Sequence, residues 1–432
     1  MKHRTFTHKW LTGLVAITLL TLSAWVVWDN WGRFLHSVDL GTTSSAHDSP
    51  DAIERGKYLA HIGGCVACHT AKGGDTLAGG RRIDTPFGAV FSSNLTTSKT
   101  NGLGDWRESD FASALSWGRS RNGRLLLPVF PYNHTSVFTP DDVHALFTWL
   151  QTVPAVEQAQ PAHQLTWPLG TQPVIAVWRS LFFTPTPFKA KANESAEWNR
   201  GAYLVQSAGH CAACHGQRNA LGSFPAVDDV SGGFLSPQMW FAPSLRDATQ
   251  TALSTSTPND TAQLLRVGQT QHAHASGPMA EFVQHSGQYL TPTDALAMAT
   301  YLTSNLKTTS GTGTPSNAPL ATSSPAGQEV YKTQCASCHG DNGEGKAHTY
   351  PALARNPAVV LAQPDNLIQM ALYGGYGPST AGNPRPYGMP PYLFTLNNQQ
   401  IADVLNHIRS QWGNQAPAVS PMQVDRARAA RY

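Results

Sequence analysis

The apolar and polar positions along the chain predict three repeated pairs of helices. In three segments apolar residues recur at helical spacing, as in IADVLNHI (401–408), so one face of each helix is expected to be buried. The segments read TPDDVHALFTWL from Thr139, TPTDALAMATYL from Thr291 and TLNNQQIADVLNHIRSQW from Thr395. Threonine is a favoured N-cap, and acidic or amide residues suit the first helical turn. We therefore expect these threonines to cap the three helices.

An earlier helix is predicted upstream of each of these, in SPDAIERGKYLAHIGG, SAEWNRGAYLVQSAGH and SPAGQEVYKTQ. Two of them open with Ser-Pro, a cap followed by the residue best tolerated at the first helical position. Tyr58, Tyr203 and Tyr331 lie 7, 8 and 4 residues before the next cysteine, so they do not all occupy one equivalent position. Each repeat thus predicts an N-terminal helix with a C-terminal helix packed across it.

The first 34 residues differ from the rest, because a basic flank precedes an apolar run from Trp10 to Trp28. Nineteen such residues nearly span a bilayer, and the flanking lysines and arginine place the N-terminus in the cytoplasm. The alternative is a cleaved signal peptide, but no small-x-small site follows Trp28 closely. We expect residues 1–34 to be a membrane anchor or signal segment, with the uncleaved anchor favoured and the remainder exported.

A length of 432 residues suits two to four compact units. The repeats occupy residues 50–155, 194–307 and 325–414, which we call the first, second and third repeats. Residues 308–324 are expected to be a flexible linker, residues 156–193 a structured strap, and residues 415–432 a tail. The strap's apolar run PVIAVWRSLFF is too short to span a membrane and contains Arg179, so a core or interface role is expected.

The chemistry is indicated by six cysteines, each pair of which is followed at once by a histidine. The three motifs are CVACH, CAACH and CASCH; their residues are Cys65, Cys68, His69, Cys211, Cys214, His215, Cys335, Cys338 and His339. This spacing places two thiols on one side of a helical turn, where they can add to the vinyl groups of haem while the histidine faces the iron.

Other uses of the cysteines fit less well. A structural zinc site needs four ligands near one another, whereas successive pairs are 146 and 124 residues apart. Redox-active or disulfide pairs would not explain a histidine after every pair. We therefore predict three covalently bound haem c groups.

The second and third repeats offer a methionine as the distal iron ligand, which would raise the reduction potential. Met279 lies 64 residues after His215, and Met389 lies 50 residues after His339. The alternatives are Met239 or Met298 for the second haem and Met370 for the third.

The first repeat contains no methionine, so another residue must fill that position or leave it open. We favour His134, which lies 65 residues after His69 and five before Thr139, much as Met389 lies six before Thr395. Neutral imidazole is an acceptable iron ligand. His61, His144 and a five-coordinate iron are the alternatives.

With these motifs in hand, the chain resembles the three-haem cytochrome c subunits of membrane-bound bacterial dehydrogenases. The resemblance runs from about Asp51 to Asn414 and includes TPFGAVFSSNLT (85–96), GLGDW (102–106), PVFPY, WPLG, APSL (242–245), NPAVV (356–360) and QQIADVLNHIRSQWGN. Alcohol-oxidising members have methionine where this chain has Phe130. The expected anchor and RNALG (218–222) are more similar to cytochromes of molybdopterin-type aldehyde or N-heterocycle dehydrogenases.

The resemblance implies an all-α fold, with three tandem class-I-like cytochrome c domains after an N-terminal transmembrane helix. It also implies a large dehydrogenase partner of molybdopterin, PQQ or flavin type, and leaves open a small iron–sulfur subunit. Electrons would pass from that partner through the haems to ubiquinone or the respiratory chain. The haem domains would lie on the periplasmic side of a bacterial cytoplasmic membrane.

Composition and motifs narrow the remaining functions. Charged residues are 13% of the chain and the net charge is +3, which does not suggest a nucleic-acid binder. No GxGxxG, GxSxG or P-loop occurs in a fitting context, so no site for an organic substrate is expected. Two alternatives to an electron-transfer subunit remain: a haem enzyme using an open first iron, and the haem c subunit of a terminal oxidase.

Overall fold

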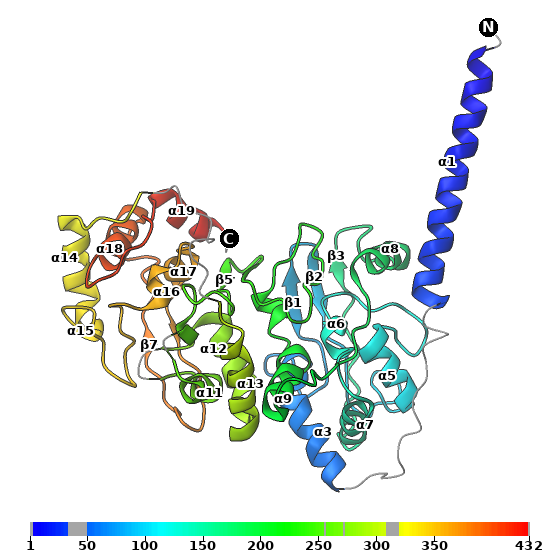
Figure 1. The fold of residues 1–432 in the computed structure, drawn as a ribbon, viewed down its shortest axis with the longest axis horizontal. Helices are drawn as coiled ribbons and strands as arrows, with labels where there is room; N and C mark the ends of the chain where they lie inside the picture. Colours follow the sequence, from blue (N-terminus) through cyan, green and yellow to red (C-terminus); the bar gives the residue numbers. More distant parts are fainter. Residues whose placement is uncertain (1–2, 33–49, 255, 271–272, 308–318, 431–432) are drawn as a thin grey trace.

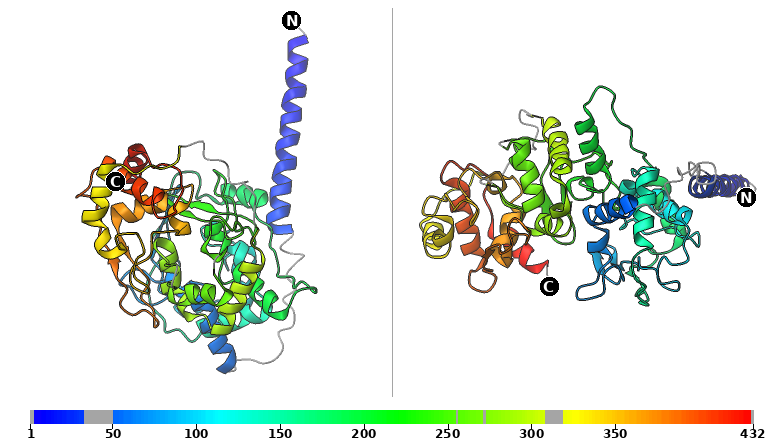
Figure 2. Two further views of the ribbon diagram at one scale, coloured as in Figure 1. Left: turned by 60° about the vertical axis from the view of Figure 1, so that its left-hand side comes forward. Right: turned by 90° about the horizontal axis from the view of Figure 1, so that it is seen from below.

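A computed structural model describes residues 3–32, 50–254, 256–270, 273–307 and 319–430. Helix α1 (His3–Val27) continues into a π-helical turn, η1 (Trp28–Gly32). Residues Leu14–Gly32 are long and apolar enough to cross a membrane, and only 6% of that stretch is buried in the protein. Figures 1 and 2 show α1 projecting from one end of the molecule, with α14 to α19 at the opposite end.

The expected helical fold is found, as the element bounds show. Within the first repeat the helices are α3 (Pro50–Ile62), α4 (Cys65–Cys68), α5 (Glu108–Trp117), α6 (Tyr132–Thr135) and α7 (Pro140–Leu150), and the strap contains α8 (Gln172–Phe182). The second repeat has α9 (Ala196–Gln206), α10 (Ala212–His215), η2 (Ala252–Ser254), α11 (Pro258–Val267), α12 (Gly277–His285), η3 (Gly287–Tyr289) and α13 (Pro292–Ser304). From the third repeat to the C-terminus come α14 (Pro325–Gln334), α15 (Ala336–His339), α16 (Pro357–Val360), α17 (Asp365–Tyr373), α18 (Asn398–Ser410) and α19 (Pro421–Ala429).

A glycine lies where the first and last long helices of each repeat cross. A Cβ on Gly56 would lie 1.9 Å from the Ala145 carbonyl oxygen, and one on Gly201 would lie 1.9 Å from that of Ala297. On Gly327 the corresponding distance to the Asp403 carbonyl oxygen is 2.3 Å. No side chain fits at such distances, so glycine permits the close crossing of α3 with α7, α9 with α13 and α14 with α18.

Two of the three predicted threonine caps are present. Thr139 Oγ1 accepts from the Asp142 backbone N–H, and Thr291 Oγ1 accepts from that of Asp294. The prediction for Thr395 is wrong, because α18 begins later and Asn397 caps it in a reciprocal pair with Gln400. The side-chain amide of Asn397, two residues further on, supplies the acceptor for the first turn.

The fold is not purely α-helical as predicted, because it also contains short strands that the sequence pattern did not indicate. Strands β1 (Arg82–Thr85), β2 (Gly88–Phe91) and β3 (Gln164–Leu165) form one antiparallel sheet in that order. Two further ribbons are β4 (Gly233–Leu235) with β5 (Trp240–Ala242), and β6 (Gly375–Tyr376) with β7 (Gly388–Met389). Because β3 belongs to residues 156–193, the sheet attaches this strap to the first repeat.

The buried side chains form two large groups. One continuous apolar core joins the first and second repeats, from Leu59 and Leu146 through Leu204 to Met298. A separate core lies within the third repeat and includes Ile401. The first two repeats therefore pack as one unit, beside the third.

Two of the expected connecting segments are described in part. Of the expected linker, residues 308–318 lie outside the described residues; in the remainder Leu320 pairs with Pro417, and Ser324 caps α14. Within the expected tail, residues 415–432, helix α19 buries Val424 against the core of the third repeat.

Candidate functional site

Each CxxCH motif lies in one helical turn that follows a long helix. The turns are α4, α10 and α15, and none of the six cysteines forms a disulfide. Burial raises the pKa of Cys65 and Cys211 to about 12 and that of Cys335 to about 11. Such desolvated thiols face apolar surroundings, which suits the edge of a haem ring.

Each of the three CxxCH histidines makes the same kind of hydrogen bond, from Nδ1 to a backbone carbonyl oxygen. Nδ1 lies 2.7 Å from the Ser93 carbonyl oxygen in His69, 2.7 Å from that of Pro243 in His215, and 2.9 Å from that of Pro351 in His339. A carbonyl only accepts, so Nδ1 carries the proton and Nε2 keeps its lone pair. Burial also lowers the pKa of all three, which keeps them neutral. Each Nε2 is therefore prepared to bind a metal.

A cavity of about 250 Å³ opens at the third CxxCH motif. Cys335, Cys338 and His339 line it together with Met370 and Met389. Two thiols, two thioethers and the imidazole of His339, one of three histidines in the lining with His274 and His348, thus meet at this cavity. They include the donor set of a covalently bound haem with a methionine ligand. Both methionines considered from the sequence reach this space.

His134, on α6, has the same hydrogen-bond pattern as the CxxCH histidines. Its Nδ1 lies 2.7 Å from the carbonyl oxygen of Gln206, and its side chain is buried, with 1% exposed. Nε2 is buried and has no hydrogen-bond partner. Burial lowers the pKa of His134 to about 3, so the ring stays neutral. A buried lone pair without a donor is costly unless it binds something, and iron would satisfy it.

The other two histidines considered for this role have different surroundings. His61 stacks on Tyr289 of the second repeat, with ring centroids 4.4 Å apart. Nδ1 of His144 lies 3.0 Å from the carboxylate of Glu108. His61 therefore contributes to packing between repeats, and His144 to a pair with a carboxylate.

In the second repeat the three methionines occupy different places. Met279, on α12, lies at the edge of the core shared with the first repeat. Met298 is 1% exposed within α13, so it is a packing residue. Met239 has a positive φ of 58° in the turn between β4 and β5.

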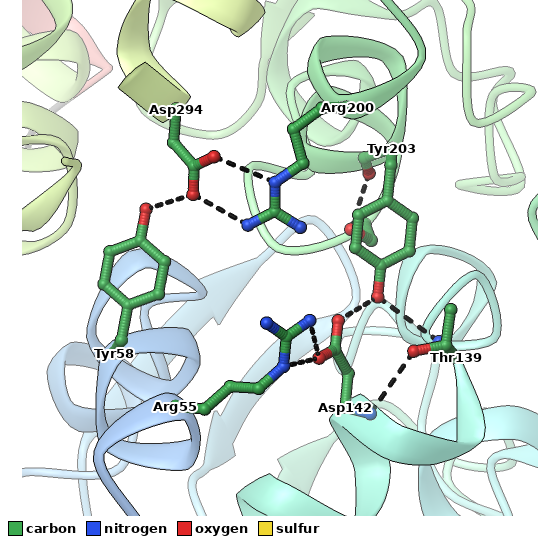
Figure 3. Close-up of polar contacts among 8 residues, drawn as sticks. Arg55, Tyr58, Thr139, Asp142, Arg200, Tyr203 and Asp294 are labelled. Atoms are coloured by element: carbon green, nitrogen blue, oxygen red, sulfur yellow. Dashed lines mark hydrogen bonds and ion pairs between the residues drawn. The ribbon is translucent and has the colours of Figure 1, made fainter. Parts of the chain in front are cut away.

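A polar network at the contact of the first two repeats was missed from the sequence. Tyr58 donates to Asp294 at 2.6 Å, and Arg200 donates to the same carboxylate at 2.7 and 2.8 Å. In mirrored fashion, Tyr203 donates to Asp142, which Arg55 also binds (Figure 3). Each aspartate therefore binds the arginine of its own repeat and the tyrosine of the other repeat.

The cytochrome c family profile matches residues 199–305 and 324–412. The gluconate 2-dehydrogenase cytochrome c subunit of Pantoea cypripedii is 37% identical over 400 residues, which cover 88% of this chain and 91% of that subunit. The chain belongs to the family of dehydrogenase cytochrome c subunits.

Two further relatives show how this cytochrome c subunit compares with others. The cytochrome c subunit of alcohol dehydrogenase (quinone) from Gluconacetobacter polyoxogenes is 36% identical, over 85% of this chain and 83% of its own length. The fructose dehydrogenase cytochrome subunit of Gluconobacter japonicus is 34% identical over 416 residues, which cover 90% of this chain and 84% of that relative.

In this cytochrome c subunit the paired networks bring the first two CxxCH turns together. Burial raises the pKa of the Cys214 thiol; the charge of Arg218 opposes this, and the Cys68 thiol of the first repeat adds a smaller upward effect. His134 reaches the end of α9 through Gln206, while Glu281, two residues after Met279, pairs with Arg81 at 4.0 Å. In the first two repeats, the predicted distal residues thus lie in segments that contact the other repeat.

A signal for the network does exist in the sequence. RGKYL (55–59) and RGAYL (200–204) carry the arginine, the crossing glycine and the tyrosine at identical spacing. Counting back from the cysteines hid this match, because one extra residue separates the motif from Cys211. Counting from the glycine shows that Tyr58 and Tyr203 are equivalent. Tyr331 lies four residues after Gly327 rather than two, so it is not.

Proposed function

We propose that this protein carries three covalently bound haem c groups and passes electrons from a partner dehydrogenase to quinone in the membrane. The shared hydrogen bond of His69, His215 and His339 to a backbone carbonyl is the observation on which the proposal rests, because it leaves the same nitrogen ready for iron at all three motifs. The three domains of the proposal are residues 50–155, 194–307 and 325–414.

The proposed iron ligands are His69 with His134, His215 with Met279, and His339 with Met389. His134 is supported by its buried, unpartnered Nε2. Met389 is supported by its place in the cavity beside His339, in β7 rather than in a helix whose other positions pack the core. Met279 is supported by its position in α12, next to the contact between Glu281 and Arg81.

Haem iron, when bound, alternates between ferric and ferrous states and so holds one electron at each site. The chain's own residues position the sites and set their potentials. Carbonyl groups of Ser93, Pro243 and Pro351 fix the histidine tautomer and ring orientation. A thioether at Met279 or Met389 stabilises the ferrous state, whereas imidazole at His134 favours the ferric state.

We further propose that α1 is retained as an anchor. Asn30, in the turn η1 that continues α1, is 3% exposed and donates to the Ala176 carbonyl at 3.0 Å and to Ser180 Oγ at 2.8 Å. Arg179 Nε donates to Asn30 Oδ1 at 3.0 Å. A leader removed after export would gain nothing from such a buried, hydrogen-bonded end. With the basic flank in the cytoplasm, the haem domains face the periplasm.

The partner is proposed to be the large subunit of a dehydrogenase that contains molybdopterin, PQQ or a flavin, with room for a small iron–sulfur subunit. The names of the relatives support a dehydrogenase partner, and no substrate-oxidising site is expected in this chain. Purification of the tagged protein from its own membranes tests the proposal. We expect three haems per chain, a co-purifying dehydrogenase and substrate-dependent reduction of a soluble quinone. A copper or haem oxidase core in its place would overturn the proposal.

A further inference from the structure

Helix α8 exposes apolar side chains and buries its only charged one. Val177 and Leu181 are 46% and 57% exposed, whereas Arg179 is 3% exposed. Val174, Val177, Trp178 and Leu181 follow the i, i+3, i+4, i+7 spacing of a single helical stripe. A helix on a water-facing surface normally shows the opposite arrangement, so this stripe needs an apolar partner.

The inner face of α8 packs against the end of the proposed anchor. Ile175 and Ala176 form a small core with Val26 and Trp31. The side chain of Asn30 bonds to Ala176 and Ser180, as described above. Figures 1 and 2 show α8 beside the lower end of α1.

This contact sets the depth of α8 relative to the bilayer. Trp25 and Trp28 are exposed near the end of the apolar stretch of α1, and tryptophans gather where lipid meets water. Asn30 follows Trp28 by two residues, so α8 lies at the level of the lipid headgroups. Exposed Trp167 and Leu221 flank the same helix; Leu221 accepts a hydrogen bond from Trp178 Nε1 at 2.8 Å.

A basic loop lies next to α8. Leu125 N–H donates to Gln172 Oε1 at 2.7 Å, and Gln172 Nε2 donates back to the Leu125 carbonyl. These two bonds hold the loop SRNGR (120–124) at the start of the helix. Arg121 and Arg124 are both exposed, and Nε of Arg121 also lies 3.8 Å from a carboxylate oxygen of Asp110. Arginines beside an apolar stripe at the level of the headgroups suit anionic phospholipids.

We propose that α8 lies in the headgroup region of the periplasmic leaflet, with its apolar stripe towards the acyl chains and with Arg121 and Arg124 towards anionic headgroups. The proposal rests on α1 being a retained anchor, and it replaces the core or interface role expected from the sequence. With two attachments, the unit formed by the first two repeats is held in one orientation against the membrane. A single helix would only tether it.

Photo-crosslinking tests this on the full, haem-loaded chain in vesicles of phosphatidylcholine and phosphatidylglycerol. The probe is a phosphatidylcholine with a diazirine in its acyl chain, and modified peptides are mapped by mass spectrometry. We expect labelling of residues 167–182 at least tenfold above that of α14, which lies at the far end of the molecule. Replacing Val177 and Leu181 by asparagine (V177N/L181N) should remove this labelling and leave that of α1 unchanged.

The outcomes are distinct. Labelling of α1 alone would overturn the role of α8 and leave the anchor standing, whereas absence of labelling in α1 would count against the anchor itself. Labelling of α8 that disappears once the dehydrogenase is bound would assign the stripe to that partner and overturn the proposal. Replacing Arg121 and Arg124 by serine should lower α8 labelling at least twofold when phosphatidylglycerol is present and have no effect without it. If the serine variant and the unmutated protein showed equal α8 labelling both with and without phosphatidylglycerol, the role of the arginines would be refuted.

Discussion

The phenolic hydroxyl of Tyr58 donates a 2.6 Å hydrogen bond to Oδ2 of Asp294, across the contact between the first and second repeats. The same carboxylate binds Arg200, and the arrangement recurs with Tyr203, Asp142 and Arg55 (Figure 3). The two repeats thus exchange equivalent hydrogen bonds about an approximate two-fold axis. This relation fixes how their CxxCH turns face each other.

Tyr58→Phe should lower the free energy of unfolding of the first two repeats by about 1.5–3 kcal/mol, because it removes a hydrogen bond to a charged, largely buried group. Urea unfolding followed by the spectra of the first and second haems measures the loss. Tyr331→Phe is the control, since its hydroxyl bonds to Gly340 within the third repeat. If Tyr331→Phe changed the unfolding of the first two repeats and Tyr58→Phe did not, this role of Tyr58 would be contradicted.

Acid should weaken the same contact. Burial alone would raise the pKa of Asp294, but hydrogen bonds from Arg200 and Tyr58 outweigh it and hold that pKa below its ordinary value. A depressed pKa stabilises the folded state fully above the unfolded value of about 3.9, and this contribution fades as the pH falls further. Unfolding of the first two repeats, measured between pH 6 and 3, should show a loss below about pH 4 that Asp294→Asn abolishes. An unchanged slope in that variant would refute the assignment.

His134→Ala should convert the first haem from a six-coordinate low-spin state to high spin. The cause is loss of the proposed distal imidazole, and low-temperature electron paramagnetic resonance reports it. His61→Ala and His144→Ala serve as controls that keep the low-spin signal. A high-spin signal already present in the unmutated protein would show an open iron and favour an enzymatic role.

The first haem should also have the lowest midpoint potential, because imidazole favours ferric iron more than a thioether does. A spectroelectrochemical titration should resolve one low midpoint and two higher ones. His134→Met should then raise the low value towards the others. Three equal midpoints in the unmutated protein would argue against a bis-histidine site.

Met389→Ala should abolish the methionine-to-iron charge-transfer band of the third haem and lower its potential. Met370→Ala is the matched control, because Met370 lines the same cavity from helix α17. Its loss should leave the band in place. The opposite pair of results would assign the ligand to Met370.

Much of this organisation was readable from local patterns. The CxxCH spacing, the two long helices of each repeat and the caps at Thr139 and Thr291 all depend on residues close together in the chain. The cap at Thr395 failed because Asn397 offers a competing acceptor two residues later. The helix α19 was missed because its outer positions are polar and only Val424 and Ala427 are buried.

The sequence by itself determined which residues can hold haem, because covalent attachment needs two thiols and a histidine within one helical turn. Only the tertiary structure decided what these turns face. Tyr58 and Asp294 are separated by 236 residues, and Asn30 and Arg179 by 149. Periodicity tells which side of a helix is buried but not against which segment. The tautomer of His134, the pairing of the first two repeats and the outward apolar stripe of α8 therefore follow from long-range packing.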